Sequence, residues 1–378
     1  MVSLAKSGKK NALIVIHSLF FELLQVALGN RERLSRTPSA AEWAEIYAVS
    51  EQQAVTGILL YGIERLKNLN ADLNLNQRFL LQWIGVGQMI EQRNHLLDER
   101  CKELLSNLTS AGLHPTILKG QGVAQYYPTA LQRLRQPGDI DVCVSDGRIK
   151  AIAYAKSIGQ KDINWDYKHL HLRVWDDTEV EMHYHVEVLL NLWKNKRLQK
   201  WFKENEVLLY FNNADLVTPT IEMNLFYILL HIYRHFFTEG VGLRQLIDYY
   251  FVLVTANGTL PKYVGGKSLE NVLKSFGMWR FARGVMWIMQ EIFALDRKYM
   301  YCEPLEKEGR FILDIVLDGG NFGHKNSFNV KGIGRVNTLV SVAKHNIQIL
   351  KKYPLEALLS PLWYVWHKAW KLRTLLYD

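Results

Sequence analysis

Two aspartates stand two residues apart in the segment Asp139–Val144, where they alternate with apolar residues. This alternation predicts a strand, on which side chains two residues apart lie on the same face. Asp139 and Asp141 would therefore face one way together, while the apolar residues face a core. Two carboxylates on one rigid face repel each other unless a cation lies between them, and carboxylate oxygens suit Mg²⁺. The pair is a candidate magnesium site.

Two further strands are expected to add polar groups to this face. The segments Lys168–Trp175 and Glu179–Val188 alternate in the same way, and the turn Asp176-Asp177 joins them. Glu187 has the same parity as Glu181 on the second of these strands. One sheet face would then collect Asp139, Asp141, Glu181, His169, His171, His183, His185 and Arg173. So polar a face is costly to bury without a function.

Two basic residues are placed to neutralise phosphate. Lys119-Gly120 ends an expected strand, Pro115–Leu118, where a helix over 121–127 begins. Backbone N–H groups at a helix N-terminus bind phosphate, and glycine permits close approach of a ligand. Lys119 would neutralise a triphosphate there. Arg135, four residues before Asp139, would do so from the other side.

These residues fall within one α/β unit, residues 111–190. Its expected order is strand, helix, strand, helix (Ile149–Ile158) and a hairpin. Residues 1–110 read as helical, with apolar residues at helical spacing over Ala40–Asn68, a capping box at Ser39 and Glu42, and a long helix over Gln77–Thr109. Residues 191–378 return to helix. The predicted fold class is α+β, with a small mixed-sheet core inserted between helical N- and C-terminal regions.

A series of short motifs carries a family resemblance. The motifs are Ile117-Leu-Lys-Gly120, Tyr127-Pro128, Arg135, Gly138-Asp-Ile-Asp141 and Val180-Glu-Met-His183. In order, spacing and placement they resemble the polymerase-β-type nucleotidyltransferases, and more narrowly the uncharacterised nucleotidyltransferases (NTP_transf_5). The resemblance covers residues 110–250 and continues more loosely through the helical segments His231–His235 and Leu243–Asp248.

The resemblance implies a role for each matched residue. Asp139 and Asp141 would bind metal, and Glu181 would complete the carboxylate triad and help to activate an acceptor hydroxyl. Lys119 and Gly120 take the place of the Gly-Ser phosphate loop of the wider superfamily, which this sequence lacks, so the mode of triphosphate binding is open. The implied reaction is transfer of a nucleoside monophosphate from an NTP, with two Mg²⁺ ions and release of pyrophosphate. The acceptor would be a small molecule or a protein.

Two other interpretations remain open at this stage. The chain could be a catalytically silent nucleotide-binding or interaction protein on the same fold, although the intact carboxylates argue against this. The histidines could instead bind a transition metal in a hydrolase, since His-x-His on a strand is a common ligand arrangement. These are His169, His171, His183 and His185. In the nucleotidyltransferase interpretation, His183 orients Glu181 or contacts the nucleotide.

Composition limits the partners and the setting. The formal net charge of +9 suits an anionic ligand such as an NTP, a nucleic acid or an acidic membrane surface. The basic residues are spread along the chain, so RNA is possible as a partner but not favoured. Three cysteines without CxxC spacing argue against a disulfide framework and favour a reducing, cytoplasmic setting.

The termini and one loop also need interpretation. Lys6, Lys9 and Lys10 precede the apolar stretch Ala12–Phe21, but His17 and Ser18 interrupt it and no signal-peptide cleavage pattern follows, so a buried helix is expected. No segment has the roughly 18 apolar residues of a membrane-spanning helix. The Gly-rich segment Gly319–Gly323 is interpreted as a loop or lid.

Two groups of side chains on the C-terminal helices also need interpretation. His231 and His235 lie one helical turn apart. They would form a core pair linked to Asp248 or, with Arg244, line a cleft above the sheet. Three tryptophans share one face near the C-terminus, and we expect this face to pack on the N-terminal helices; an interfacial membrane helix is the alternative. They are Trp363, Trp366 and Trp370.

Overall fold

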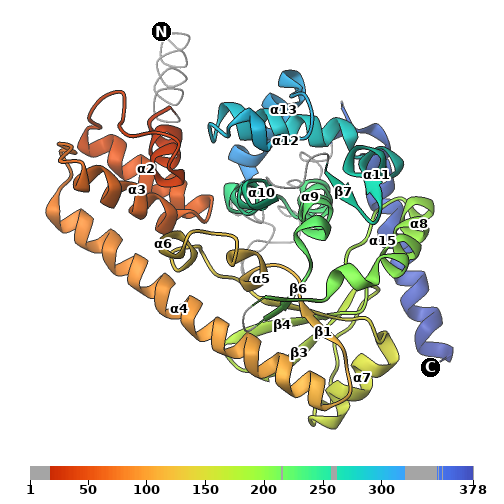
Figure 1. Cartoon of the computed structure of the whole chain (residues 1–378). Coiled ribbons are helices and arrows are strands. Elements are labelled where there is room, and N and C mark those ends of the chain that lie inside the picture. Colours follow the sequence, from red (N-terminus) through yellow and green to blue (C-terminus); the bar gives the residue numbers. More distant parts are fainter. Residues whose placement is uncertain are drawn as a thin grey trace, which may run out of the picture.

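The computed structural model describes residues 18–213, 216–256, 262–319, 347, 349–350 and 352–377. Figure 1 shows a small sheet with helices on both sides of it. The lysines near the N-terminus, most of the apolar stretch after them, and the Gly-rich loop beyond Gly319 lie outside the described residues. The α+β fold class predicted from the sequence is confirmed.

The N-terminal region is helical, as predicted. A helix over residues 18–28 is followed by α2 (Ala40–Gln52), α3 (Thr56–Asn68) and α4 (Gln77–Ser110). Ser39 caps α2 by accepting from the Glu42 N–H, and the Glu42 carboxylate accepts from the Ser39 N–H, so the capping box is present. The helical spacing over 40–68 belongs to two helices, because Ala54 between them has a positive φ of 55°.

Four strands form the sheet. They are β1 (Pro115–Ile117), β2 (Ile140–Val144), β3 (His169–Trp175) and β4 (Thr178–His183), in the order β1-β2-β4-β3. The pair β2–β4 is parallel and the other two pairs are antiparallel, so the sheet is mixed as expected. Three helices lie between the strands: α5 (Gln121–Ala124), α6 (Thr129–Gln132) and α7 (Arg148–Ser157). Strand β4 ends at His183, five residues before the end predicted for it.

The two faces of the sheet differ in character. The even-numbered residues of β2 and β4 pack with residues of α4 and α7 in one apolar cluster, so α4 and α7 cover this face. In Figure 1 these two helices lie on the side of the sheet away from α9 (Ile221–Phe237) and α10 (Leu243–Thr255). The face toward α9 and α10 carries the odd-numbered, polar residues.

The C-terminal region is mostly helical, with two short strand pairs that the sequence did not indicate. The first pair is β5 (Phe211–Asn213) with β6 (Leu216–Thr218), and the second is β7 (Tyr263–Val264) with β8 (Lys267–Ser268). The other elements are α8 (Leu192–Glu204), η1 (Glu206–Leu209), α11 (Leu269–Phe276), α12 (Trp279–Glu291), η3 (Arg297–Tyr299), α13 (Glu306–Gly319) and α15 (Pro354–Tyr377).

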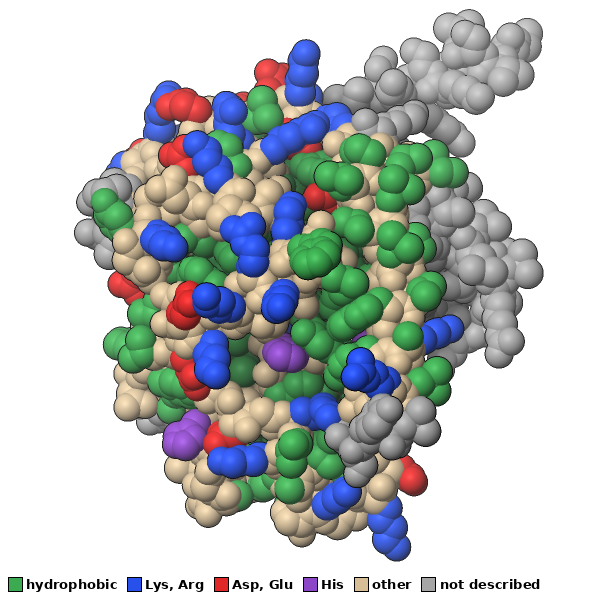
Figure 2. Space-filling model, turned by 90° about the vertical axis from the view of Figure 1, so that its right-hand side faces the viewer, with side chains coloured by type: hydrophobic (Ala, Val, Ile, Leu, Met, Phe, Trp, Pro, Cys, Tyr) green, Lys and Arg blue, Asp and Glu red, His purple; other side chains and the backbone are tan. Residues whose placement is uncertain are grey.

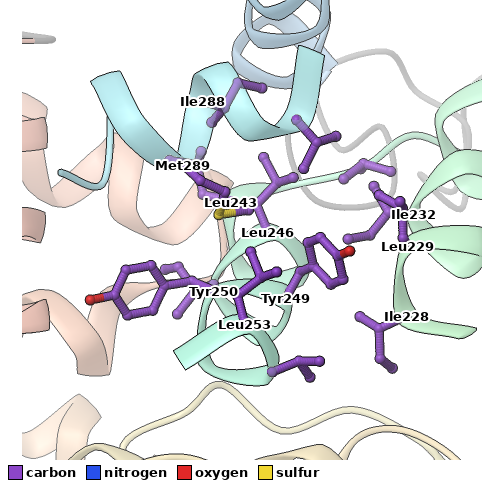
Figure 3. Packing of buried hydrophobic residues seen from close by; sticks show 14 of the residues in the cluster. Ile228, Leu229, Ile232, Leu243, Leu246, Tyr249, Tyr250, Leu253, Ile288 and Met289 are labelled. Carbon is purple, nitrogen blue, oxygen red and sulfur yellow. The ribbon is translucent and has the colours of Figure 1, made fainter. Parts of the chain in front are cut away.

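Helices α9 and α10 are held in place by a large apolar core. Figure 3 shows Ile228, Leu229 and Ile232 of α9 beside Leu246 and Tyr249 of α10, with residues of α12 next to them. Nearly every residue of α9 and α10 is buried. The two helices therefore form a fixed roof over the polar face of the sheet.

The two helical regions also contact each other across the sequence. The buried Gln53 amide donates to the Val316 carbonyl at 3.1 Å and accepts from the Leu243 N–H at 3.0 Å. The Asn30 amide donates to the Tyr250 hydroxyl at 2.8 Å. These bonds join the helices before the sheet to the helices after it, and the chain passes through the sheet between them.

The tryptophans of α15 pack against a different element from the one predicted. They pack around Tyr167, in the loop before β3, with ring centroids 5.7, 5.1 and 5.1 Å away for Trp363, Trp366 and Trp370. Amphipathic spacing identifies the buried face of a helix but not the element that covers it. Figure 2, the side on which α8 and α15 lie, shows more Lys and Arg than Asp and Glu. No helix among the described residues is long and apolar enough to cross a membrane.

Candidate active site

Strand register collects the polar residues on the face below α9 and α10. Residues of β2, β4 and β3 stand opposite one another in two adjacent rows. The rows are Asp141–Glu181–His171 and Cys143–His183–His169. Asp139 comes directly before β2, two residues before Asp141, and so lies on the same side of the sheet as Asp141. The structure therefore brings together the carboxylates that the sequence placed on one face.

Lys119 lies among these carboxylates. It follows β1, and its Nζ is 2.7 Å from Asp141 Oδ2 and 3.7 Å from Asp139 Oδ2. Burial acts to lower the pKa of Lys119, but the three neighbouring carboxylates outweigh burial and raise it above its usual value. The lysine is thus a fixed positive charge in the space between two carboxylates.

His183 ties two of the carboxylates together. Its Nε2–H donates to Asp141 Oδ1 at 2.9 Å and lies 3.3 Å from Glu181 Oε2. Burial and Lys168 act to lower the pKa of His183, but the bonds to the two carboxylates raise it overall. The predicted role of His183 in orienting Glu181 is consistent with this position.

The three carboxylates differ in how well they are compensated. Burial and the charge of Asp141 raise the pKa of Asp139. Burial also acts to raise the pKa of Asp141 and of Glu181, but Lys119 lowers the first and His183 lowers the second overall. Asp139 is the carboxylate that would gain most from a further cation, since it has the least compensation.

A small cavity opens over the aspartates, between the sheet and the roof helices. It is lined by Lys119, Gly120, Arg135, Gly138, Asp139, Asp141, Ile228, His231, Arg244, Gln245 and Asp248. A charged wall of carboxylates and cations therefore surrounds the space in which a phosphate-bearing ligand could lie. His231 lines this cavity with Arg244 and Asp248, but its ring is buried and pairs with Glu187, whereas His235 is buried beside Glu239 and outside the lining.

Arg135 is held by a carboxylate of the roof. Its Nε and one terminal nitrogen donate to Asp248 at 2.7 and 2.8 Å, and the Tyr127 hydroxyl donates to the same carboxylate at 2.6 Å. Arg135 is only 4% exposed, so a phosphate would meet its edge and not a free guanidinium. Arg244 lies beside the residue before Asp139, since a Cβ at Gly138 would be 3.4 Å from its NH1, and its charge acts to lower the pKa of Asp139.

Gly120 adopts a conformation that favours glycine. Its φ is 59°, and a Cβ there would lie 3.5 Å from the Asp139 carbonyl. The helix that follows is a single turn, Gln121–Ala124, shorter than the segment expected. The backbone is turned sharply between Lys119 and this helix, beside the aspartates.

Two residues expected on the polar face, His185 and Glu187, lie elsewhere because β4 ends at His183. The His185 ring stacks on Tyr167, with centroids 4.7 Å apart. Glu187 is fully buried, 3.1 Å from Lys168 Nζ and 2.9 Å from His231 Nδ1. Arg173, near an irregularity in β3, is exposed. The Lys168–Glu187–His231 network was missed, because its members come from three separate segments.

The comparison with known families agrees with this geometry. A model of a family described as "uncharacterised nucleotidyltransferase" matches residues 39–294, which include the whole sheet and both roof helices. The chain belongs to this family and is therefore classed as a nucleotidyltransferase, which confirms the resemblance seen in the sequence. No match to a curated protein or to a solved structure was found.

Proposed function

We propose that the chain transfers a nucleoside monophosphate from an NTP to an acceptor hydroxyl, with Mg²⁺ and with release of pyrophosphate. One observation carries the proposal: Asp139, Asp141 and Glu181 lie together on one face of the sheet, and Lys119 lies between the two aspartates where they line the cavity. Buried carboxylates in excess of nearby cations are a suitable donor set for a hard divalent ion. Asp139, Asp141 and Glu181 would hold it. When bound, the metal would stabilise charge on the reacting phosphate oxygens.

Each protein group then has a task in the transfer. The acceptor oxygen attacks the α-phosphorus as the bond from that phosphorus to the β-phosphate oxygen breaks, so pyrophosphate leaves. Lys119 would turn from Asp141 toward the phosphates once a metal neutralises the carboxylates. Arg244 supplies a second positive charge at the cavity wall, while Arg135 positions the loop before Asp139. Glu181 would accept a hydrogen bond from the acceptor hydroxyl. Positioning and charge neutralisation are the main requirements of such reactions.

The acceptor is proposed to be a small molecule or a protein. The cavity over the aspartates is lined by residues of α9 and by the charged Arg244 and Asp248 of α10, and these helices are buried in the apolar core, so the site is enclosed on that side. An enclosed site suits a compact acceptor. RNA is the less favoured alternative.

The test is NTP binding measured by thermal stabilisation. A ligand that binds only the folded state raises stability by about 2.7 kcal/mol at 100 times its Kd. The wild type should show an upward shift in Tm with Mg²⁺ and at least one NTP, and Asp139→Ala/Asp141→Ala should not. Asp162→Ala/Asp176→Ala makes the same charge change at two exposed positions and should keep the shift.

The opposite results separate the alternatives. A Mg²⁺-dependent shift that survives in the active-site double variant would place the nucleotide elsewhere. No shift in the wild type with any NTP would remove the donor-binding proposal. A shift without pyrophosphate release across a broad set of acceptors would favour the silent nucleotide-binding protein.

A further inference from the structure

The outer part of the polar face contains two histidines that the proposed reaction does not use, next to Glu181, which it does use. His169 and His171 project from β3 on the same side, and Glu181 on β4 stands directly opposite His171. Imidazole and carboxylate donor atoms of these three residues all lie within 4.8 Å of one another. All three side chains are half-buried.

The donor spacing is close to that of a bound metal. His169 Nε2 is 3.6 Å from Glu181 Oε1, and the two imidazole rings have centroids 5.1 Å apart. Two ligands of a tetrahedral zinc ion, each at 2.0–2.2 Å from the metal, are separated by roughly 3.4 Å. Small side-chain rotations are therefore enough to direct the three donors at one ion.

The far side of His169 supports the same interpretation. Its Nδ1 is buried and has no hydrogen-bond partner within the part of the chain that the structure describes. The nearest carboxylate, Asp166 Oδ1, is 4.0 Å away. A metal-binding histidine typically donates its other N–H to a carboxylate, which fixes the ring. Asp166 is placed to take this position when His169 turns toward a metal.

This group is distinct from the aspartate pair. The sheet order β1-β2-β4-β3 places Lys119 and the aspartates on one side of Glu181, and the two histidines on the other. Glu181 presents Oε2 toward His183 and Oε1 toward His169. One carboxylate thus separates an oxygen-rich site from a nitrogen-rich one.

We propose that His169, His171 and Glu181 bind one transition-metal ion, of the Zn²⁺ type, beside the magnesium site. Imidazole nitrogens suit Zn²⁺ and related ions, whereas Mg²⁺ prefers oxygen ligands. Three protein ligands leave a coordination position open for an oxygen or nitrogen of another molecule. If the proposed transfer holds, the open position faces the acceptor side of Glu181, because the phosphate-binding groups lie on the opposite side. The acceptor would then be one that carries a metal-binding group.

A second group with two histidines, close to α9, does not compete well for an ion. Glu187, His231 and His235 also come close together. However, Glu187 is already paired with Lys168 and His231, at 3.1 and 2.9 Å. A cation there would have to displace a buried ammonium group.

The experiment measures metal binding without nucleotide or Mg²⁺. The full chain is stripped with chelator, loaded with Zn²⁺ and passed through a desalting column, and bound zinc is determined by elemental analysis. We expect one zinc per chain in the wild type, and at least 100-fold weaker binding in His169→Ala and His171→Ala. His114→Ala, which removes an exposed histidine, should bind like the wild type. Co²⁺ in place of Zn²⁺ should give visible absorption typical of nitrogen ligands in the wild type and in His114→Ala, but not in the other two variants.

Two outcomes would overturn the proposal. One is the absence of bound zinc in the wild type. The other is that His169→Ala and His171→Ala bind as much zinc as the wild type, which would place the ion at another donor set. His171→Asn, with circular dichroism of each variant, separates loss of a ligand from loss of folding. Asp139→Ala/Asp141→Ala should keep zinc while losing Mg²⁺-dependent NTP stabilisation, and His171→Ala should do the reverse. The metal proposal and the transfer proposal can therefore fail separately.

Discussion

The aspartate pair on the sheet and Asp248 on α10 face the same cavity, but their charges are compensated in opposite ways. Asp139 and Asp141, with Glu181 beside them, share one lysine and one histidine. Asp248, on α10, is a single carboxylate that accepts two hydrogen bonds from Arg135 and one from the Tyr127 hydroxyl. The first group has more carboxylates than cations, while the second is a closed ion pair. The excess of negative charge, and not the presence of a buried aspartate, distinguishes a cation site from a structural contact.

Glu181 and Glu187 show the same contrast along one segment. Glu181 lies on β4 at the cavity side of the sheet and is 22% exposed, while Glu187 is fully buried against Lys168 and His231. Both are glutamates of the same strand parity in the sequence. Only their partners, which come from other elements, make one a candidate ligand and the other a structural anchor.

The largest expected effect tests the closed ion pair. Asp248→Ala leaves Arg135 buried without its carboxylate, and removing one partner of a buried pair costs about 3–5 kcal/mol. The free energy of unfolding in urea measures this loss. Arg135→Met/Asp248→Leu should recover part of it, because neither charge remains. A loss below about 1 kcal/mol for Asp248→Ala would mean that the pair is not structural.

Removing Lys119 from the cluster of Asp139, Asp141 and Glu181 should reduce stability by a smaller amount, and a bound metal should reverse the loss. Lys119→Met leaves three carboxylates without their nearest cation, and we expect a loss of about 2 kcal/mol in the presence of chelator. Millimolar Mg²⁺ should restore more stability to Lys119→Met than it adds to the wild type, because the ion replaces the ammonium group. Urea unfolding with and without Mg²⁺ measures both. If Mg²⁺ stabilises the two proteins equally, the ion does not take the position of the Lys119 ammonium group.

Removing one carboxylate from this cluster should not destabilise the metal-free protein. The raised pKa of Asp139 means that its charged form is disfavoured in the fold, so Asp139→Asn should be neutral or stabilising by up to about 1 kcal/mol. The same variant should lose Mg²⁺-dependent NTP stabilisation. Thermal unfolding in chelator and then in Mg²⁺ with NTP separates the two effects. Marked destabilisation in chelator would show that Asp139 is a structural residue like Asp248.

The smallest effect concerns a histidine that belongs to neither group. Burial lowers the pKa of His185 to about 4, from an ordinary value of 6.5. The unfolded imidazole therefore binds a proton at a higher pH than the folded one, and stability falls as pH drops from 6.5 toward 4. His185→Phe, which keeps a ring beside Tyr167, should lessen this fall by about 0.5–1 kcal/mol near pH 5.5. Urea unfolding between pH 7 and 5 checks it, with His114→Phe as the exposed control.

Much of the site could be predicted from local patterns. The alternation around Asp141 and Glu181 correctly indicated which side chains share a strand face, and the Ser39 capping box correctly marked the start of α2. Lys119, which the sequence marked as a candidate phosphate ligand, lies between these aspartates. Such features depend on the two-residue repeat of a strand or the first turn of a helix, so neighbouring residues are enough to specify them.

The partners of the buried charges could not be predicted in the same way. Arg135, which was predicted to neutralise phosphate, pairs with Asp248, which lies 113 residues further along the chain. Because β4 ends at His183, His185 and Glu187 do not lie on the polar face. The tryptophans of α15 pack against Tyr167 and not against the N-terminal helices. Nothing in the spacing of these residues indicates which distant segment covers them.

By itself, the sequence determined the set of residues able to do chemistry and the face on which each would lie, because backbone geometry fixes the side-chain direction from one residue to the next. The tertiary structure decided how those faces are combined. The order β1-β2-β4-β3 sets Glu181 between the aspartates and the histidines, and α9 and α10 close a cavity over one side. These relations depend on contacts between segments far apart in the chain, and the energy of a buried charge depends on which partner such a contact supplies.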